Sequence, residues 1–477
     1  MTGLDLFVMG AYFAVVLAIG GYFARRQTDA TDYFLGRHHM PWVAVMLSIV
    51  ATETSALTVI SIPGLGARSN LTFLQVAFGY LIGRIGVSAW LLPGYFRGEQ
   101  ETAYARLETR FGQPTRRLAS AVFMSVRALG DSVRVFATAI PLTIVTGWSI
   151  PTSVVVVCVA TVIYTWAGGI RAVIWVDVMQ LVLYSIGGLV TVLVAVRLAG
   201  GLDVAFGSAL ESGRLQTFDW SLSFTAPYTF IGGIVGGALL SAASHGTDHL
   251  IVQRILTVQN LSNARKALIG SGILVIAQFA LFLLVGALIW AAGADDGTLA
   301  SDEIFPRFIV DHLPAGIAGL VIAGLLAAAM STVSSSLNSL ASATTHDFYA
   351  PMTGRRDPQH LLTVGRWATL AWAVVLMGGA LAFPSRDTPV VVLALSIASI
   401  AYGGLLGTFI MSGMMSRAEG RDAIAAIVVT TAVMIVVVLI KPGPFANLAW
   451  PWYVPMGTAI TLSVGYTSAT VRRMTTL

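Results

Sequence analysis

Long apolar stretches alternate with short polar connections over the whole chain. About 20 consecutive apolar residues suffice to cross the hydrocarbon core of a bilayer, and thirteen stretches approach or exceed that length. The pattern predicts an all-α integral membrane protein with about thirteen transmembrane helices. The expected spans are Leu4–Phe23, Pro41–Gly66, Phe73–Tyr95, Leu118–Thr146, Pro151–Trp166, Ala172–Val196, Tyr228–Val252, Ala267–Ala292, Ala315–Thr345, Trp367–Phe383, Val390–Met415, Ala423–Ile440 and Trp452–Ser468.

The second span has an unusual polar centre. The side chains concerned are Thr52, Glu53, Thr54, Ser55 and Thr58. A carboxylate and several hydroxyls at mid-depth in a bilayer are costly unless they face protein, water or an ion. This span is therefore predicted to line a transport pathway, and Pro63 with Gly64 is expected to end its continuous helix.

Composition excludes a soluble globular protein. Of the 477 residues, 56% are hydrophobic and 11% are charged, whereas soluble domains carry about 25% charged residues. The net charge of +5 implies no nucleic-acid partner, and the single cysteine, Cys158, allows no intramolecular disulfide. The first apolar run follows an acid and precedes arginines, opposite to the order in a cleaved signal, so it is expected to remain as a span.

Basic residues predict the orientation. Alternating thirteen spans divides the loops into two sets, and most of the 28 lysines and arginines fall in one set, which includes Arg37, Arg116, Arg254 and Arg355. Positively charged loops lie preferentially on the cytoplasmic side. We therefore expect a multi-pass protein of the cell membrane, plasma or inner, with its N-terminus outside and its C-terminus in the cytoplasm. The long outside loops, 200–227 and 293–314, are expected to be caps or gates.

The ninth span concentrates hydroxyl groups. Its polar residues are Ser331, Thr332, Ser334, Ser335, Ser336 and Asn338. Hydroxyl and carbonyl oxygens are hard ligands that suit a small cation such as sodium. Hydroxyls at membrane helix contacts also form interhelical hydrogen bonds, but this density favours a cation site.

Three other spans carry ionisable groups. Asp177 in the sixth span requires a cation or a salt bridge to an arginine. Arg127, Asp131 and Arg134 share one face of the fourth span, where they either neutralise one another or leave one guanidinium for a substrate carboxylate. Arg84 in the third span is expected to form internal hydrogen bonds.

The seventh span is also predicted to be interrupted. A glycine-rich run leads into SAASHGTDH, which contains Ser244, His245, Asp248 and His249. Two interrupted spans, five apart, are typical of inverted repeats whose broken helices bind substrate and ion near the midplane. The two histidines have a spacing that permits a metal, but a hydrogen-bonding or gating role is favoured because no third ligand converges in the sequence.

Several segments together resemble the sodium:solute symporter family. They are SIVATETSALTVISIPG, GRIGVSAWLLPGYFRG, TWAGGIRAVIWVDVMQ, GTDHLIVQRIL and AAAMSTVSSSLNS. The resemblance implies the leucine-transporter-type fold of five plus five inverted helices. It places a preceding helix and loop in residues 1–40, the two repeats in 41–196 and 228–415, and two extra helices in 416–477.

The resemblance also implies sodium ligands. The family-wide sodium site would use the carbonyls of Ala51, Thr54 and Ala328 and the hydroxyls of Ser331 and Thr332. A second sodium site, of the kind found in sialic acid transporters, would use Asp177, Ser334 and Ser335.

The expected solute carries a carboxylate. The resemblance implies substrate contacts from Glu53, Ser55 and Thr58, and Arg127, Arg134 and Ser244 are added as candidates. Glu53 favours an amine or a cation over a bare carboxylate. An amino acid bound between Glu53 and an arginine is the first hypothesis, and a monocarboxylate or sialic acid-like anion is the alternative.

Sodium-coupled symport by alternating access is the predicted function. Sodium ions, a small organic solute and the lipid bilayer are the expected partners, and a monomer is expected with a dimer as the alternative. No phosphate-binding loop for ATP and no catalytic pair is present in the sequence, so an enzyme is not expected. An ion channel is a more remote alternative, because the polar groups cluster at mid-depth rather than along a pore.

Overall fold

The computed structural model is built from helices connected by loops. It describes residues 2–24, 29–54, 56–97, 102–295, 297–382 and 390–476. The α-helices are α1 (Gly3–Ala24), α2 (Ala30–Leu35), α3 (Trp42–Glu53), α4 (Ala56–Arg68), α5 (Leu74–Gly86), α6 (Leu92–Tyr95), α7 (Ala105–Phe111), α8 (Gln113–Thr146), α9 (Ile150–Leu198), α10 (Leu202–Glu211), α11 (Gly237–Gly246), α12 (His249–Leu256), α13 (Leu261–Ala291), α14 (Ile304–His312), α15 (Ile317–Ala343), α16 (Ala350–Thr353), α17 (Pro358–Leu381), α18 (Val390–Met414), α19 (Gly420–Ile435) and α20 (Tyr453–Thr476).

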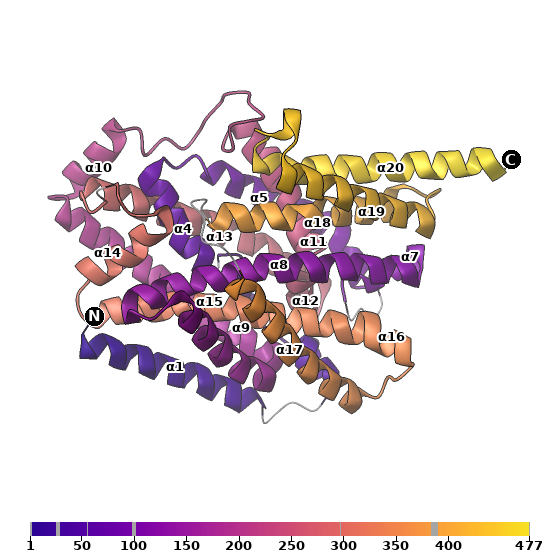
Figure 1. The fold of residues 1–477 in the computed structure, drawn as a ribbon, viewed down its shortest axis with the longest axis horizontal. Coiled ribbons are helices and arrows are strands. Elements are labelled where there is room, and N and C mark those ends of the chain that lie inside the picture. Colours follow the sequence, from indigo (N-terminus) through magenta and orange to yellow (C-terminus); the bar gives the residue numbers. More distant parts are fainter. Residues whose placement is uncertain are drawn as a thin grey trace.

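Short wide turns extend several of these helices. The π-helical turns η2 (Val87–Leu91) and η5 (Thr344–Tyr349) join α5 to α6 and α15 to α16, and η3 (Gly232–Gly236) leads into α11. The long helices run roughly along the longest axis of the molecule, and the two chain ends lie at opposite ends of it (Figure 1). An odd number of membrane crossings requires such an arrangement of the termini.

Each expected span coincides with helix, but not every helix is long and apolar enough to cross a membrane by itself. Within the described ranges nine helices meet that condition, or ten if the bent pair α3 and α4 counts as one span. The all-helical membrane architecture is confirmed. The number thirteen and the orientation of the termini stay predictions.

Two predicted spans are divided by breaks, and a third break separates two spans inside one helix. Helix α9 contains Gly169 at φ 55° and ψ −163°, a conformation outside the helical region, so that its two halves correspond to the fifth and sixth spans. Helix α11 ends at Gly246, and Asp248 begins α12 by accepting a hydrogen bond from the Leu250 amide. The interruption predicted for the seventh span is therefore present.

The break in the second span lies earlier in the chain than predicted. Segments Trp42–Glu53 and Thr58–Arg68 meet at 57°, and Thr54 after α3 has φ −87° and ψ 56°. Pro63 and Gly64 lie inside α4 rather than at its end. Tertiary contact explains why the helix continues, because a Cβ on Gly64 would lie 2.1 Å from the Ser301 carbonyl oxygen. The connection around Ser301 thus packs directly on α4.

Helix α15 lies at the centre of the protein. It contacts α1, α8, α9 and α17 along its length and reaches α3 and α4. All its residues from Val321 to Ala343 are buried, including the hydroxyl cluster of the predicted ninth span. A helix surrounded on all sides by other helices can carry polar groups, because their partners come from protein instead of lipid.

Close packing of α13 against α4 predicts that a side chain at Gly286 destabilises the protein. A Cβ on Gly286 would lie 1.8 Å from the Pro63 carbonyl oxygen, whereas a Cβ on Gly378 in α17 would meet no atom within 4 Å. We expect Gly286→Ala to destabilise the protein by about 1–3 kcal/mol through overpacking and Gly378→Ala to have little effect. Thermal unfolding of the purified variants in detergent measures both, and equal midpoints would contradict the assigned packing.

Candidate functional site

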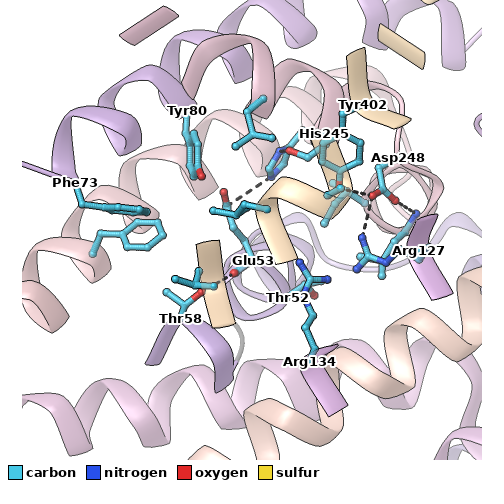
Figure 2. A pocket seen from close by; sticks show the side chains of 18 residues that line it. Thr52, Glu53, Thr58, Phe73, Tyr80, Arg127, Arg134, His245, Asp248 and Tyr402 are labelled. Carbon is cyan, nitrogen blue, oxygen red and sulfur yellow. Dashed lines mark hydrogen bonds and ion pairs between the residues drawn. The ribbon is translucent and has the colours of Figure 1, made fainter. Parts of the chain in front are cut away.

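A cavity lies between the two helix breaks. Thr52, Glu53 and Thr58 line it from α3 and α4, and Ser244 and His245 line it from α11. Leu240 also lines it from α11. The remaining walls come from α5, α8, α12, α13 and α18 and from the cap residues that precede α5 and α12, through Phe73, Tyr80, Arg127, Arg134, Asp248, Leu250, Ile251, Phe279, Val391, Leu395, Ala398 and Tyr402 (Figure 2). The cavity therefore combines charged and hydroxyl groups with broad apolar walls.

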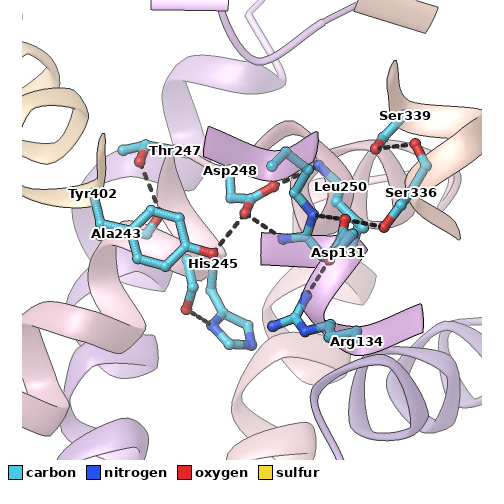
Figure 3. A network of polar contacts seen from close by, with 12 residues as sticks. Asp131, Arg134, Ala243, His245, Thr247, Asp248, Leu250, Ser336, Ser339 and Tyr402 are labelled. Atoms are coloured by element: carbon cyan, nitrogen blue, oxygen red, sulfur yellow. Dashed lines mark hydrogen bonds and ion pairs between the residues drawn. The ribbon is translucent and has the colours of Figure 1, made fainter. Parts of the chain in front are cut away.

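The charged face predicted on α8 forms an ion pair with the residue at the break between α11 and α12. Asp131 accepts from Arg127 Nε at 2.6 Å and from Arg134 Nη1 at 2.6 Å. Arg127 Nη1 also reaches Asp248 Oδ2 at 2.9 Å, and the Tyr402 hydroxyl donates to the same oxygen at 2.7 Å (Figure 3). The single excess positive charge inferred from α8 is therefore balanced by Asp248. This acid, 121 residues from Arg127, was not identified as its partner from sequence.

Arg134 forms fewer ion pairs than Arg127. Its side chain is 19% exposed, compared with 9% for Arg127. Its Nε is buried without a hydrogen-bond partner among the residues that the structure describes. Arg134 can therefore offer a donor to a ligand in the cavity, while Arg127 already binds two carboxylates.

Glu53 is paired within the protein. The fully buried Arg84 of α5 donates to Glu53 Oε2 and, at 2.7 Å, to the Ser271 hydroxyl. His245 Nε2 lies 3.6 Å from the same glutamate oxygen. The internal hydrogen-bonding role expected of Arg84 is thus present, and Glu53 reaches the cavity as half of an ion pair with 14% of its side chain exposed.

Hydroxyl groups complete the polar lining. Thr58 donates to the Glu53 carbonyl at 3.2 Å, and Ser244 lies 2.8 Å from His245 Nδ1. Thr52 donates to the Ser48 carbonyl at 2.7 Å. Ser55, an expected solute contact, lies outside the described residues.

The residues of the expected sodium site lie on two helices that pack against each other, α3 and α15. Ala51 and Thr54 are buried at the end of α3, and Ala328, Ser331 and Thr332 are buried in α15. The Thr54 hydroxyl lies 3.0 Å from the Tyr184 hydroxyl of α9 and donates to Gln278 Oε1 at 2.9 Å. Asp177 of α9 accepts from Ser48 at 2.5 Å and from Ser331. These contacts connect α3, α9 and α15 around one buried region.

Two of the three expected second sodium ligands contact an arginine. Arg254 Nη2 of α12 lies 3.2 Å from Asp177 Oδ2 and also donates to the Ser335 hydroxyl. Ser334 instead donates to the Ser331 carbonyl at 2.9 Å. Arg254 was assigned to a cytoplasmic loop from sequence, but it is fully buried because Asp177, which is equally buried, compensates its charge. The salt-bridge alternative for Asp177 is the one present.

The two histidines have separate hydrogen-bonding or ionic partners. His249 accepts from the Ala103 amide at 3.3 Å and lies 3.1 Å from the Ser342 hydroxyl, while His245 faces Glu53. Across the described ranges, no three His, Cys, Asp or Glu side chains gather to hold a metal ion. Their hydrogen-bonding role agrees with the favoured interpretation.

Comparison with known proteins gives one consistent result. The sequence model of the sodium:solute symporter family matches residues 33–430. The sodium/sialic acid symporter NanT of Aliivibrio fischeri is 29% identical over 98% of this chain and 93% of its own length. The human sodium-coupled monocarboxylate transporter 2 is 27% identical over 95% of this chain and 75% of its own length.

Comparison with solved structures gives the same result as comparison of sequences. A substrate-bound, outward-open Na+-coupled sialic acid symporter superposes with a TM-score of 0.89 at 26% identity, covering 98% of both chains. Mhp1, a nucleobase-cation-symport-1 family transporter, gives a TM-score of 0.61 at 14% identity over 94% of this chain and 95% of its own. These similarities confirm the predicted leucine-transporter-type fold.

The buried pair between Asp177 and Arg254 predicts a non-additive double-mutant cycle. Arg254→Gln leaves an uncompensated carboxylate between α3, α9 and α15, and we expect a loss of about 3–5 kcal/mol in stability. Asp177→Asn alone should cost a similar amount, because it leaves the guanidinium buried. The double variant should recover much of the loss, as measured by thermal unfolding. Additive losses would show that the two side chains do not compensate each other.

Proposed function

The chain belongs to the sodium:solute symporter family, and we propose that it imports a small organic anion whose carboxylate binds at Arg134. Sodium-coupled symport follows from the family and from relatives named for sodium coupling. The observation that carries the solute class is the unpaired donor of Arg134 in the cavity. Glu53 is neutralised by Arg84, whereas Arg134 retains a buried donor without a partner in the described chain.

Carboxylate recognition suits the geometry around Arg134. A guanidinium binds a carboxylate through parallel N–H donors, and one edge of Arg134 is taken by Asp131. Phe73, Phe279 and Leu240 also line the cavity, and they would cover the apolar part of a solute. The relatives named for sialic acid and for monocarboxylates support an anion of this kind.

An amino acid is the second candidate. Glu53 lines the cavity and keeps 14% of its side chain exposed, so an ammonium group can approach it. That approach competes with Arg84 and His245 for the same carboxylate. The organic anion is favoured because its carboxylate can bind Arg134 without breaking an ion pair that already exists in the protein.

Sodium is the coupled cargo. We assign it to the carbonyls of Ala51, Thr54 and Ala328 with the hydroxyls of Ser331 and Thr332, since these oxygens suit sodium and lie in one buried region. Asp177, Ser334 and Ser335 are left out of this site, because Arg254 contacts the first and last of them. Inward movement of each sodium ion yields about 2.3 kcal/mol per 100 mV, which drives accumulation of the solute through alternating access.

The orientation and assembly belong to the same proposal. We place the N-terminus outside and the C-terminus in the cytoplasm of the cell membrane, because basic loops favour that side. The solute cavity and the sodium ligands all come from one chain, so a monomer suffices for the transport cycle.

Ion replacement tests the coupling. We expect proteoliposomes to accumulate the solute under an inward sodium gradient and to lose accumulation when choline replaces sodium. Ser331→Ala with Thr332→Ala should raise the half-saturating sodium concentration at least tenfold, because two of five ligands are removed. Uptake that persists in choline, or under a proton gradient alone, would refute sodium coupling. Unchanged sodium dependence in the double variant would refute the ligand assignment.

Variants at Arg134 test the solute class. A thermal-shift screen of monocarboxylates, sialic acids and amino acids in saturating sodium identifies stabilising ligands. Arg134→Gln should raise the solute Kd at least tenfold, because the carboxylate loses its guanidinium. Arg197→Gln, at an exposed end of α9, is the matched control and should leave the Kd unchanged. Stabilisation by amino acids but not by their deaminated analogues would favour the second candidate.

A further inference from the structure

We propose that a groove between α3 and α13 binds an anionic glycerophospholipid of the cytoplasmic leaflet, with the lipid phosphate at Arg265 and Lys266. The choice of leaflet rests on the proposed orientation, whereas the groove and its charge are features of the structure. The residues that line the groove are Trp42, Met46, Ser262, Arg265, Lys266, Ile269 and Gly270. None of them lines the solute cavity or belongs to the proposed sodium site.

The lining residues of α13 form one face of the helix. Their positions follow the spacing i, i+3, i+4, i+7 and i+8, which is the repeat of a single helical face. Ser262, Arg265 and Lys266 come first, and Ile269 and Gly270 follow about one turn later. The face therefore changes from polar to apolar along the helix, with a rise of about 6 Å for every four residues.

Helix α3 runs parallel to α13 along this face. Lys266 Nζ lies 6.0 Å from the ring centre of Trp42, and a Cβ on Gly270 would lie 2.5 Å from Met46 Sδ. These two contacts are four residues apart on both helices, so the helices share one direction and keep their register over this turn. Trp42 thus lies at the polar end of the groove, as expected where tryptophan rings occupy the level of the lipid head groups.

Two cations occupy the polar end of the groove. Arg265 Nε donates to the Ser88 carbonyl of η2 at 3.0 Å, which holds this side chain beside the third predicted span. Among the residues that the structure describes, no acidic side chain pairs with Arg265 or Lys266, and the first turn of α13 contains no acid. Both cations are exposed. This end of the groove is therefore positively charged and accessible from the bilayer surface.

An anionic phospholipid matches the charge at this end. Basic pockets between transmembrane helices on the cytoplasmic side bind anionic head groups. Guanidinium and ammonium groups donate to phosphate oxygens, and the exposed Ser262 hydroxyl can add a third donor. A zwitterionic lipid also carries a phosphate, but its own ammonium group is repelled by Arg265 and Lys266. The groove is therefore expected to select lipids with a net negative charge.

The apolar half of the groove distinguishes a lipid from a soluble phosphate. Met46 and Ile269 are only partly buried, and Gly270 adds no side chain between them and the bilayer. An acyl chain can cover this surface while its phosphate binds the cations one turn away. A soluble phosphate would use the polar end alone, so the combination of the two halves favours a lipid.

Lipid binding to the purified full-length protein tests the proposal. Native mass spectrometry in a neutral detergent should show dioleoylphosphatidylglycerol bound at least tenfold more tightly than dioleoylphosphatidylcholine. Arg265→Gln with Lys266→Gln should raise the phosphatidylglycerol Kd at least tenfold, because the phosphate loses both cations. Ile269→Ser should raise it at least threefold. Arg355→Gln with Arg356→Gln is the matched control, because these two arginines are exposed and lie outside the groove, and it should change the Kd less than twofold.

Each alternative occupant gives a different result. Competition by glycerol 3-phosphate at the concentrations at which the lipid binds would assign the groove to a soluble phosphate and overturn the proposal. Equal binding of the two lipids, or equal losses in the two double variants, would show unspecific attraction and would also overturn it. A dimer that forms without lipid and dissociates in Arg265→Gln with Lys266→Gln would assign the groove to a second copy of the chain. If that variant does not fold, unchanged lipid binding in Lys266→Gln alone overturns the proposal.

The outcomes separate this inference from the proposed function. A detergent solution has neither leaflets nor an ion gradient, so lipid binding is measured whether or not the protein couples a solute to sodium. Uptake that does not depend on sodium would refute the proposed function and leave the lipid site in place. Sodium-dependent uptake by a protein that does not distinguish the two lipids would refute only the lipid site.

Discussion

The bridge from Arg127 to Asp248 holds the cavity together. It links the middle of α8 to the residue that begins α12, and the same carboxylate receives the hydroxyl of Tyr402 from α18. Three helices therefore meet at one acid beside a helix break. In a low-dielectric interior neither partner can be left alone without a large desolvation cost. The position of the break is consequently tied to the charges on α8, and the shape of the cavity depends on this connection.

The need to pair each buried charge with an opposite charge also explains the other ion pairs of the interior. Arg84 pairs with Glu53, and Arg254 pairs with Asp177. Each pair joins two helices, so the ionic contacts act as specific connections in a core whose apolar contacts are largely interchangeable. Buried polar atoms that lack a hydrogen-bond partner are informative for this reason. Arg134, which lines the solute cavity, retains a buried Nε without a partner in the described chain.

Sequence alone predicted the properties that depend on local composition. Apolar length gave the helical membrane architecture, and the density of hydroxyls in α15 marked a buried polar region. The interruption of the seventh span was visible because a glycine-rich run leads into a polar segment. The partners of buried charges could not be predicted, because Arg254 lies 77 residues from Asp177 and its sequence neighbours resemble those of a loop arginine. The break at Thr54 was likewise misplaced to Pro63, because contacts of α4 with loop 293–314 and α13 keep that proline inside a helix.

Coupling between the two cargo sites has a simple physical basis at the end of α3. Glu53 and Thr54 are consecutive, yet Glu53 faces the cavity with Arg84 and His245, whereas Thr54 faces Tyr184 and Gln278. At a helix break the backbone carbonyls lose their intrahelical donors and need other partners. Sodium at the Thr54 carbonyl, as proposed above, would restrict the same backbone that positions Glu53 one residue earlier. On that proposal, occupancy of the sodium site and the geometry of the solute cavity are linked through two consecutive residues of one backbone segment.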